Sequence, residues 1–157
     1  MRKVVTKSLE ETHAVAKEFL VWLNTTHKET TPVLALYGDL GAGKTAFVQG
    51  LAKAIGIKER ITSPTFVLMK NYAICCGFDS SWSELVHIDA YRFETADDLK
   101  ALNWEKVIMP ADKIVALEWP ERVATALPMD TTIPLYFRFI DETTREIELP
   151  DSVASSL

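Results

Sequence analysis

The chain has 157 residues, of which 48% are hydrophobic and 25% charged, values typical of one globular domain spanning residues 1–157. Its 17 Lys and Arg residues against 22 Asp and Glu residues give a formal net charge of −5, which disfavours tight direct binding of RNA or DNA by this chain alone. Apolar runs such as Val33–Tyr37 are far shorter than the roughly 20 residues that span a bilayer, and the start has no long apolar signal core, so we expect a cytoplasmic protein without membrane contact.

The first predicted element is a helix over residues 9–23. Ser8 and Glu11 are typical of a capping box at its start, and apolar residues recur along it at helical spacing. The polar residues 24–31 predict a loop. The run 32–37 that follows is apolar on both faces and too short for a helix, which predicts a buried parallel strand.

A glycine-rich motif follows this strand directly and matches the pattern G-x-x-x-x-G-K-[ST]. A helix over residues 45–54, ending at Gly56, is predicted after it. In such a unit, backbone amides and the helix dipole converge on a phosphate group. Lys44 is expected to reach the β- and γ-phosphates, and the Thr45 hydroxyl to hold Mg²⁺. The motif therefore predicts nucleoside triphosphate binding by Asp39, Leu40, Gly41, Ala42, Gly43, Lys44 and Thr45.

The remaining elements alternate between strands and helices. The pattern predicts a loop at 63–65, a strand over 66–74, a loop at 75–83, a strand over 85–89, a helix over 95–102, a strand over 113–117, and hairpin strands over 131–140 and 146–149. Pro134 favours an edge position for this hairpin. Together the elements predict an α/β, P-loop NTPase-like fold of three layers: a mixed, mostly parallel sheet with helices on both faces and an antiparallel C-terminal edge hairpin.

Two of the predicted apolar strands end in a carboxylate. Asp89 ends His87-Ile88-Asp89, and Glu118 follows Val115-Ala116-Leu117. The carboxyl ends of parallel strands meet at the edge where α/β proteins bind ligands, so both acids can point into the crevice that holds the phosphate loop. Either acid alone could equally be a surface residue. Both together favour a pair that binds Mg²⁺ and positions water.

Four other features each have two interpretations. Residues 63–66 lie where nucleotide hydrolases carry switch segments, but Ser-Pro is also a simple turn signal. Arg92 is either a charge clamp or the partner of a nearby surface acid. Trp119 either packs on a nucleotide or partner, or is buried beside the strand end. His87 beside Asp89 could form a metal pair, but the other histidines lie outside any zinc-ligand spacing.

The phosphate loop and three later motifs, taken in order, resemble the bacterial TsaE (YjeE) family. The later motifs are Ser63-Pro64-Thr65-Phe66, His87-Ile88-Asp89-Ala90-Tyr91-Arg92 and Glu118-Trp119-Pro120-Glu121, and the resemblance covers about residues 6–122. It implies a small ATPase that works with TsaD and TsaB in the threonylcarbamoyl modification of adenosine 37 in tRNAs that read codons beginning with A. ATP would drive or reset the complex, and tRNA would be served only indirectly.

The resemblance also implies roles for individual residues. Lys44 and Thr45 would serve phosphate and Mg²⁺, Asp89 and Glu118 would carry the metal and the hydrolytic water, and Trp119 would lie close to the nucleotide. The segment 63–66 would be a switch.

The sequence departs from the family pattern in two places. Asn103 stands where a glycine is expected, and we predict that it keeps the turn because Asn tolerates left-handed backbone. The loop 75–83, with the adjacent cysteines Cys75 and Cys76, is longer than usual.

Two alternatives to the family ATPase remain open. A small-molecule or nucleotide kinase shares the phosphate loop, but the arginines after Lys44 are dispersed and form no cluster typical of a kinase lid. A nucleotide-gated binding subunit that barely hydrolyses ATP by itself overlaps with the family interpretation.

Overall fold

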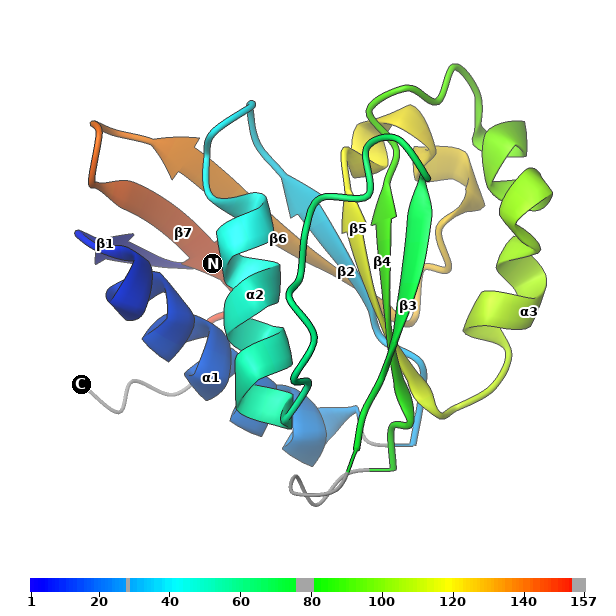
Figure 1. Cartoon of the computed structure of the whole chain (residues 1–157), viewed down its shortest axis with the longest axis horizontal. Coiled ribbons are helices and arrows are strands. Elements are labelled where there is room, and N and C mark those ends of the chain that lie inside the picture. Colours follow the sequence, from blue (N-terminus) through cyan, green and yellow to red (C-terminus); the bar gives the residue numbers. More distant parts are fainter. Residues whose placement is uncertain (28, 76–80, 154–157) are drawn as a thin grey trace.

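The chain forms one mixed sheet of seven strands in the order β1-β7-β6-β2-β5-β4-β3 (Figure 1). The structure is a computed structural model and describes residues 1–27, 29–75 and 81–153. The strands are β1 (Arg2–Thr6), β2 (Val33–Tyr37), β3 (Met69–Ala73), β4 (Glu84–Asp89), β5 (Lys113–Glu118), β6 (Thr132–Phe139) and β7 (Arg145–Leu149). The central strands β6, β2, β5 and β4 run parallel, and the outer pairings are antiparallel. This is the mixed α/β architecture that the sequence predicts.

Helices cover both faces of the sheet. On one face α1 (Leu9–Thr26) and α2 (Lys44–Ile55) pack side by side, and on the other lie the 3-10 helix η1 (Ala96–Leu102) and α3 (Trp104–Ile108) (Figure 1). Alternate residues of the central strands supply the two apolar cores, because successive side chains of a strand point to opposite faces. In the described residues, no helix is long and apolar enough to cross a membrane.

The start of α1 agrees with the predicted cap. The Ser8 hydroxyl accepts a hydrogen bond from the Glu11 amide at 3.1 Å, and the Glu11 carboxylate accepts one from the Lys7 amide at 2.7 Å. The helix extends through Thr26, so the predicted loop over 24–31 begins too early. The hydroxyls of Thr25 and Thr26 donate to the Trp22 carbonyl, which satisfies that oxygen near the end of the helix.

Two predicted elements are shorter or tighter in the structure. The strand predicted over 66–74 pairs only from Met69 to Ala73, because residues 64–68 form a turn in which the Leu68 amide donates to the Pro64 carbonyl. The helix predicted over 95–102 is the 3-10 helix η1, which is capped by Thr95 and Asp98 as a capping box. Asn103 follows it with φ 54°, so the predicted left-handed turn is confirmed.

The C-terminal hairpin of β6 and β7 forms near one side of the sheet, but the prediction that it is the edge is wrong, because the unpredicted strand β1 pairs with β7 outside it. Pro134 pairs with Ala35 of β2, while β7 pairs only with residues 136–139 of β6. The proline therefore has a ladder neighbour on one side only, and its missing N–H interrupts no pairing. Of the predicted loop 75–83, residues 76–80 lie outside the described residues, Cys76 among them; Cys75 is exposed and reduced.

Gly50 sets the close approach of α1 and α2. A Cβ atom at this position would lie 2.8 Å from both the Ala16 Cβ and the His13 Cα. Helix backbones that approach this closely leave no room for a side chain, so the helices must separate if one is added.

We therefore expect Gly50→Leu to lower the free energy of unfolding by about 1–3 kcal/mol, in spite of the better helix propensity of leucine. Urea denaturation measures the change. Lys53→Leu, at an exposed position of the same helix, is the matched control and should change stability by no more than about 0.5 kcal/mol. Equal stability of the two variants would show that the helices do not depend on this contact.

Candidate functional site

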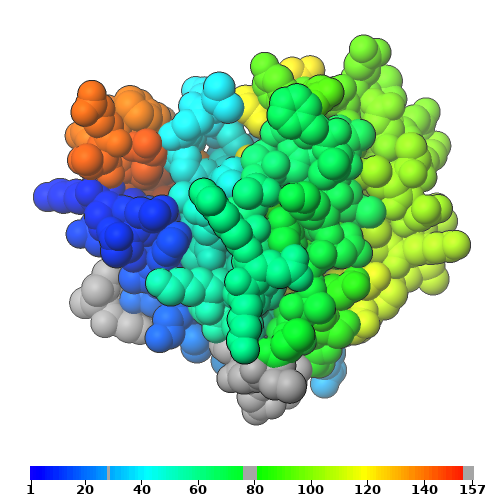
Figure 2. All heavy atoms as spheres, viewed as in Figure 1, coloured from blue at the N-terminus to red at the C-terminus, as the bar shows by residue number. Residues whose placement is uncertain are grey.

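The predicted site residues converge where β2, β5 and β4 end. The parallel register sets Glu118 beside Leu36 on one side and beside Asp89 on the other. Leu36 belongs to the core under α1 and α2, and Glu118 and Asp89 share its face of the sheet by the alternation of side chains. The phosphate loop leaves β2 at the same edge and enters α2 on the same face. Figure 2 shows the cyan residues around this loop beside the green segment that follows α2, along the upper rim of the molecule.

The loop from Gly38 to Gly43 has the backbone of a phosphate-binding turn. Gly38 has φ 145°, and a Cβ atom there would lie 2.4 Å from the Phe137 carbonyl oxygen, so only glycine fits. Gly43, with φ 102°, is the left-handed N-cap of α2, which begins at Lys44. The first amides of a helix have no partner within it and, with the dipole, attract an anion. Residues 39–45 therefore form a strand–loop–helix turn with the backbone geometry that phosphate binding requires, and their binding of a nucleotide stays a prediction.

The Lys44 side chain is 4% exposed and lies across the loop. Its Nζ donates to the carbonyls of Gly38 and, at 2.9 Å, of Asp39, and lies 4.3 Å from the centre of the Trp119 ring. Burial lowers the pKa of this ammonium group from its ordinary value, while Glu118 and other nearby carboxylates act in the opposite direction. A phosphate group at the loop would add negative charge and favour the protonated lysine.

Glu118 links the phosphate loop to the sheet. Its Oε1 accepts a hydrogen bond from the Thr45 hydroxyl at 2.7 Å and lies 2.9 Å from His87 Nε2. Both Glu118, at 4% exposed, and His87, at 0%, are buried. His87 therefore turns toward Glu118, and the metal pair of His87 with Asp89, which the sequence disfavoured, does not form.

Asp89 holds the segment that follows α2. Its Oδ2 accepts from the hydroxyls of Ser63, at 3.0 Å, and Thr65, at 2.8 Å, and its Oδ1 accepts from the Tyr91 amide at 2.9 Å. Leu68, with φ 66°, ends the turn. The structure thus separates the two acids: Glu118 contacts the phosphate loop, and Asp89 contacts residues 63–65.

Two side chains with open interpretations take definite positions. Trp119 is half-buried, stands at φ 59°, and packs against Tyr91 with ring centres 5.0 Å apart. Its ring is in reach of Lys44 rather than deep in a core. The Arg92 guanidinium stacks on the exposed ring of Phe66, 4.9 Å from its centre.

Arg145 is a site residue that sequence reasoning missed. It lies on β7, yet its Nε donates to the Gly41 carbonyl at 3.0 Å, and its side chain packs 3.4 Å from the position of a Cβ atom on Gly43. A hollow of about 400 Å³ adjoins this contact and is lined by Gly43 and Ala46 of the loop and helix, by residues 7–9 and by Arg145. More than a hundred residues separate Arg145 from the loop, so no local sequence pattern predicts this contact.

The donor set at Thr45 and Glu118 fits magnesium better than zinc. Across residues 1–27, 29–75 and 81–153, no three His, Cys, Asp or Glu side chains gather into a metal-binding group. A hydroxyl and carboxylates are the hard oxygen ligands that Mg²⁺ prefers, and magnesium in nucleotide sites takes the rest of its shell from phosphates and water. Thr45, Glu118 and the neighbouring Asp89 fit such an ion.

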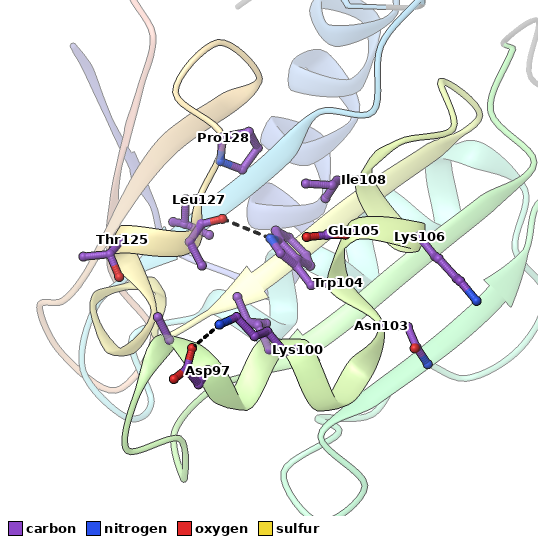
Figure 3. Close-up of a pocket in the computed structure, with 13 residues that line it drawn as sticks. Asp97, Lys100, Asn103, Trp104, Glu105, Lys106, Ile108, Thr125, Leu127 and Pro128 are labelled. Carbon is purple, nitrogen blue, oxygen red and sulfur yellow. Dashed lines mark hydrogen bonds and ion pairs between the residues drawn. The ribbon is translucent and has the colours of Figure 1, made fainter.

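A second hollow, of about 790 Å³, lies on the opposite face of the sheet between η1, α3 and residues 125–128 (Figure 3). Trp104 forms part of its wall, and its indole Nε1 donates to the Ala126 carbonyl at 3.0 Å. Lys100 pairs with Asp97 at its rim. This hollow contains none of the motif residues and offers no buried acid pair, so it is not the candidate site.

Comparison with known proteins points to one family. The family model described as "Threonylcarbamoyl adenosine biosynthesis protein TsaE" matches residues 6–147. A tRNA threonylcarbamoyladenosine biosynthesis protein TsaE of Treponema pallidum is 37% identical over 119 residues, which are 76% of this chain and 82% of that protein. The TsaE protein of a Nostoc species is 40% identical over 74% of this chain and 68% of its own length. The crystal structure of Bacillus subtilis YdiB superposes with a TM-score of 0.66 at 30% identity, covering 93% of this chain and 82% of that one.

The contacts of Asp89 predict its effect on the segment 63–68. Asp89→Ala removes the acceptor of two hydroxyls and one amide, so we expect the amides of residues 64–69 to exchange with deuterium about 10–100-fold faster. Mass spectrometry of peptides from this segment measures the rate. Glu105→Ala, which removes an exposed carboxylate from α3, is the control and should leave the rate unchanged. An unchanged exchange rate in Asp89→Ala would show that the turn is stable without hydrogen bonds to this carboxylate.

Proposed function

Since this chain belongs to the TsaE family of tRNA threonylcarbamoyladenosine biosynthesis proteins, we propose that it serves that pathway as a magnesium-dependent ATPase. The observation that carries the proposal is the contact of the Thr45 hydroxyl with the Glu118 carboxylate, at 2.7 Å, at the mouth of the phosphate loop. A hydroxyl and a buried acid in this arrangement are what P-loop enzymes use to hold the ion on the β- and γ-phosphates.

The loop and Lys44 are assigned to the triphosphate. Amides of residues 41–45 would donate to phosphate oxygens, and Lys44 would exchange its carbonyl partners for the β- and γ-phosphates. Thr45 and Glu118 would hold the magnesium ion, which when bound neutralises charge on the phosphate oxygens. The hollow beside Gly43 and Ala46 would take the adenosine, with Arg145 fixing the loop at its rim.

Asp89 is assigned to the segment 63–68 and to the water. Its Oδ2 accepts from the hydroxyls of both Ser63 and Thr65, so if Thr65 turned to the metal or γ-phosphate, one acceptor position on Oδ2 would become free while Ser63 stayed bound. A carboxylate freed in this way beside the terminal phosphate can orient the attacking water. The conformation of the segment 63–68 would then depend on the bound nucleotide, as in the switch segments of nucleotide hydrolases.

The proposed partners are TsaD and TsaB, and the proposed use of ATP is to drive or reset their complex. Exposed apolar side chains surround the site, among them Leu40 and Phe66, each 88% exposed, and Val67. Apolar groups gathered at a surface are typical of protein contacts. Threonylcarbamoyl transfer would belong to TsaD, and the net charge of −5 agrees with a subunit that meets tRNA only through the complex.

Turnover of ATP by the purified chain with Mg²⁺, alone and with TsaD and TsaB, tests the proposal. We expect the partners to raise the rate, Lys44→Ala to abolish it, and Glu118→Ala to lower kcat by about 100-fold or more while its ATP affinity in EDTA stays the same. Glu105→Ala is the control on the opposite face and should keep the wild-type rate. If the rate of ATP turnover were the same with and without the partners and phosphate appeared on a small acceptor, the chain would instead be a kinase.

A further inference from the structure

His87 is a buried polar side chain to which the proposed chemistry assigns no role. It lies within β4, with Lys70 of β3 and Ala116 of β5 as its register partners, and is 0% exposed. A histidine that only fills a core commonly pairs both ring nitrogens. Here Nε2 lies 2.9 Å from Glu118 Oε1, and Nδ1 has no partner among the described residues.

The unpaired Nδ1 defines the proton position on the ring. A buried N–H without an acceptor is costly, so a neutral ring with its proton on Nε2 leaves only a lone pair unpaired. In this tautomer Nε2 donates to Glu118. The Thr45 hydroxyl donates to the same carboxylate oxygen at 2.7 Å, so two donors from different elements fix Oε1.

The consequence concerns the direction of the second carboxylate oxygen. If Glu118 rotated away from the ring, the Nε2–H of the fully buried His87 would lose its acceptor. The Thr45 bond alone cannot maintain this direction, because the same hydroxyl is proposed to turn to the magnesium ion. Once it turns, His87 is the remaining hydrogen-bond partner of the carboxylate among the described residues.

We propose that His87 is a positioning residue for the magnesium–ATP complex: its Nε2–H holds the Glu118 carboxylate in the orientation that meets the ion. The inference rests on the proposed function, because it assigns Glu118 to the metal. Partners of this kind behind a metal ligand typically change metal affinity or activity by about 10–100-fold when they are removed.

Two variants separate positioning from packing. His87→Leu fills the space without a donor, whereas His87→Gln places an amide N–H where Nε2 lies. We expect His87→Leu to raise the Mg²⁺ concentration at half-maximal ATP turnover, or to lower kcat, by about 10–100-fold, with ATP affinity in EDTA unchanged. His87→Gln should restore most of the loss. His13→Leu, which removes a half-buried imidazole from α1, is the control and should match the wild type.

A second readout needs no turnover. In nitrogen-15 spectra of the unliganded wild-type chain, His87 should carry its proton on Nε2 with Nδ1 bare, and Glu118→Ala should shift the Nε2 resonance. A proton on Nδ1, or wild-type magnesium dependence in His87→Leu, would overturn the inference and leave the proposed function standing. If ATP turnover by the wild-type chain did not depend on Mg²⁺, both the proposed function and this inference would be overturned.

Discussion

The pairing of β5 with β2 on one side and with β4 on the other is the constraint on which the site depends. Its register puts Glu118 next to the strand that enters the phosphate loop and next to Asp89. A shift of one residue in β5 would turn Glu118 to the face of α3, away from Thr45. Apolar side chains of these strands pack under α1 and α2 and fix the register, so the chemistry of the edge rests on packing several residues away.

Hydrogen bonds from the protein stabilise the two buried carboxylates at this edge, Glu118 and Asp89, without a lysine or arginine in the described part of the chain to neutralise them. Burying a carboxylate is costly unless its oxygens accept hydrogen bonds. Glu118 is satisfied by a hydroxyl and an imidazole, and Asp89 by two hydroxyls and an amide. Within the described residues, no Lys or Arg forms an ion pair with either acid, and Lys44 bonds to carbonyls instead. Both acids therefore have no cationic lysine or arginine partner of their own in the described ranges of the chain, and the loop amides lie beside them, an arrangement that suits a cation together with the phosphates of a nucleotide.

Local patterns in the sequence predict the parts of the fold that local physics determines. The cap at Ser8, the apolar run of β2, the glycine loop and the strand ends at Asp89 and Glu118 all depend on neighbours in the chain, and each lies where it was predicted. The strand predicted over 66–74 was too long, because apolar residues there are exposed in a turn instead of buried in a sheet.

The contacts between distant residues could not be predicted in this way. Thr45 with Glu118, His87 with Glu118, and Arg145 with the loop join separate strands through sheet register and hairpin position. β1 is short, and its residues Arg-Lys-Val-Val-Thr do not alternate between apolar and polar types in the sequence, so it becomes a strand through its pairing with β7. The sequence predicts both acids at this edge but not their different contacts. In the structure Glu118 contacts the phosphate loop and Asp89 contacts the segment 63–65.

The magnesium dependence of ATP binding tests the assignment of Glu118 most directly. Calorimetry would give the ATP dissociation constant with Mg²⁺ and with EDTA for the wild type and for Glu118→Gln, which keeps the size of the side chain and removes its charge. The account predicts that Mg²⁺ tightens binding to the wild type and that Glu118→Gln loses most of this gain while it binds ATP in EDTA as before. The same gain in both proteins would contradict the account, because the ion would then be held without Glu118.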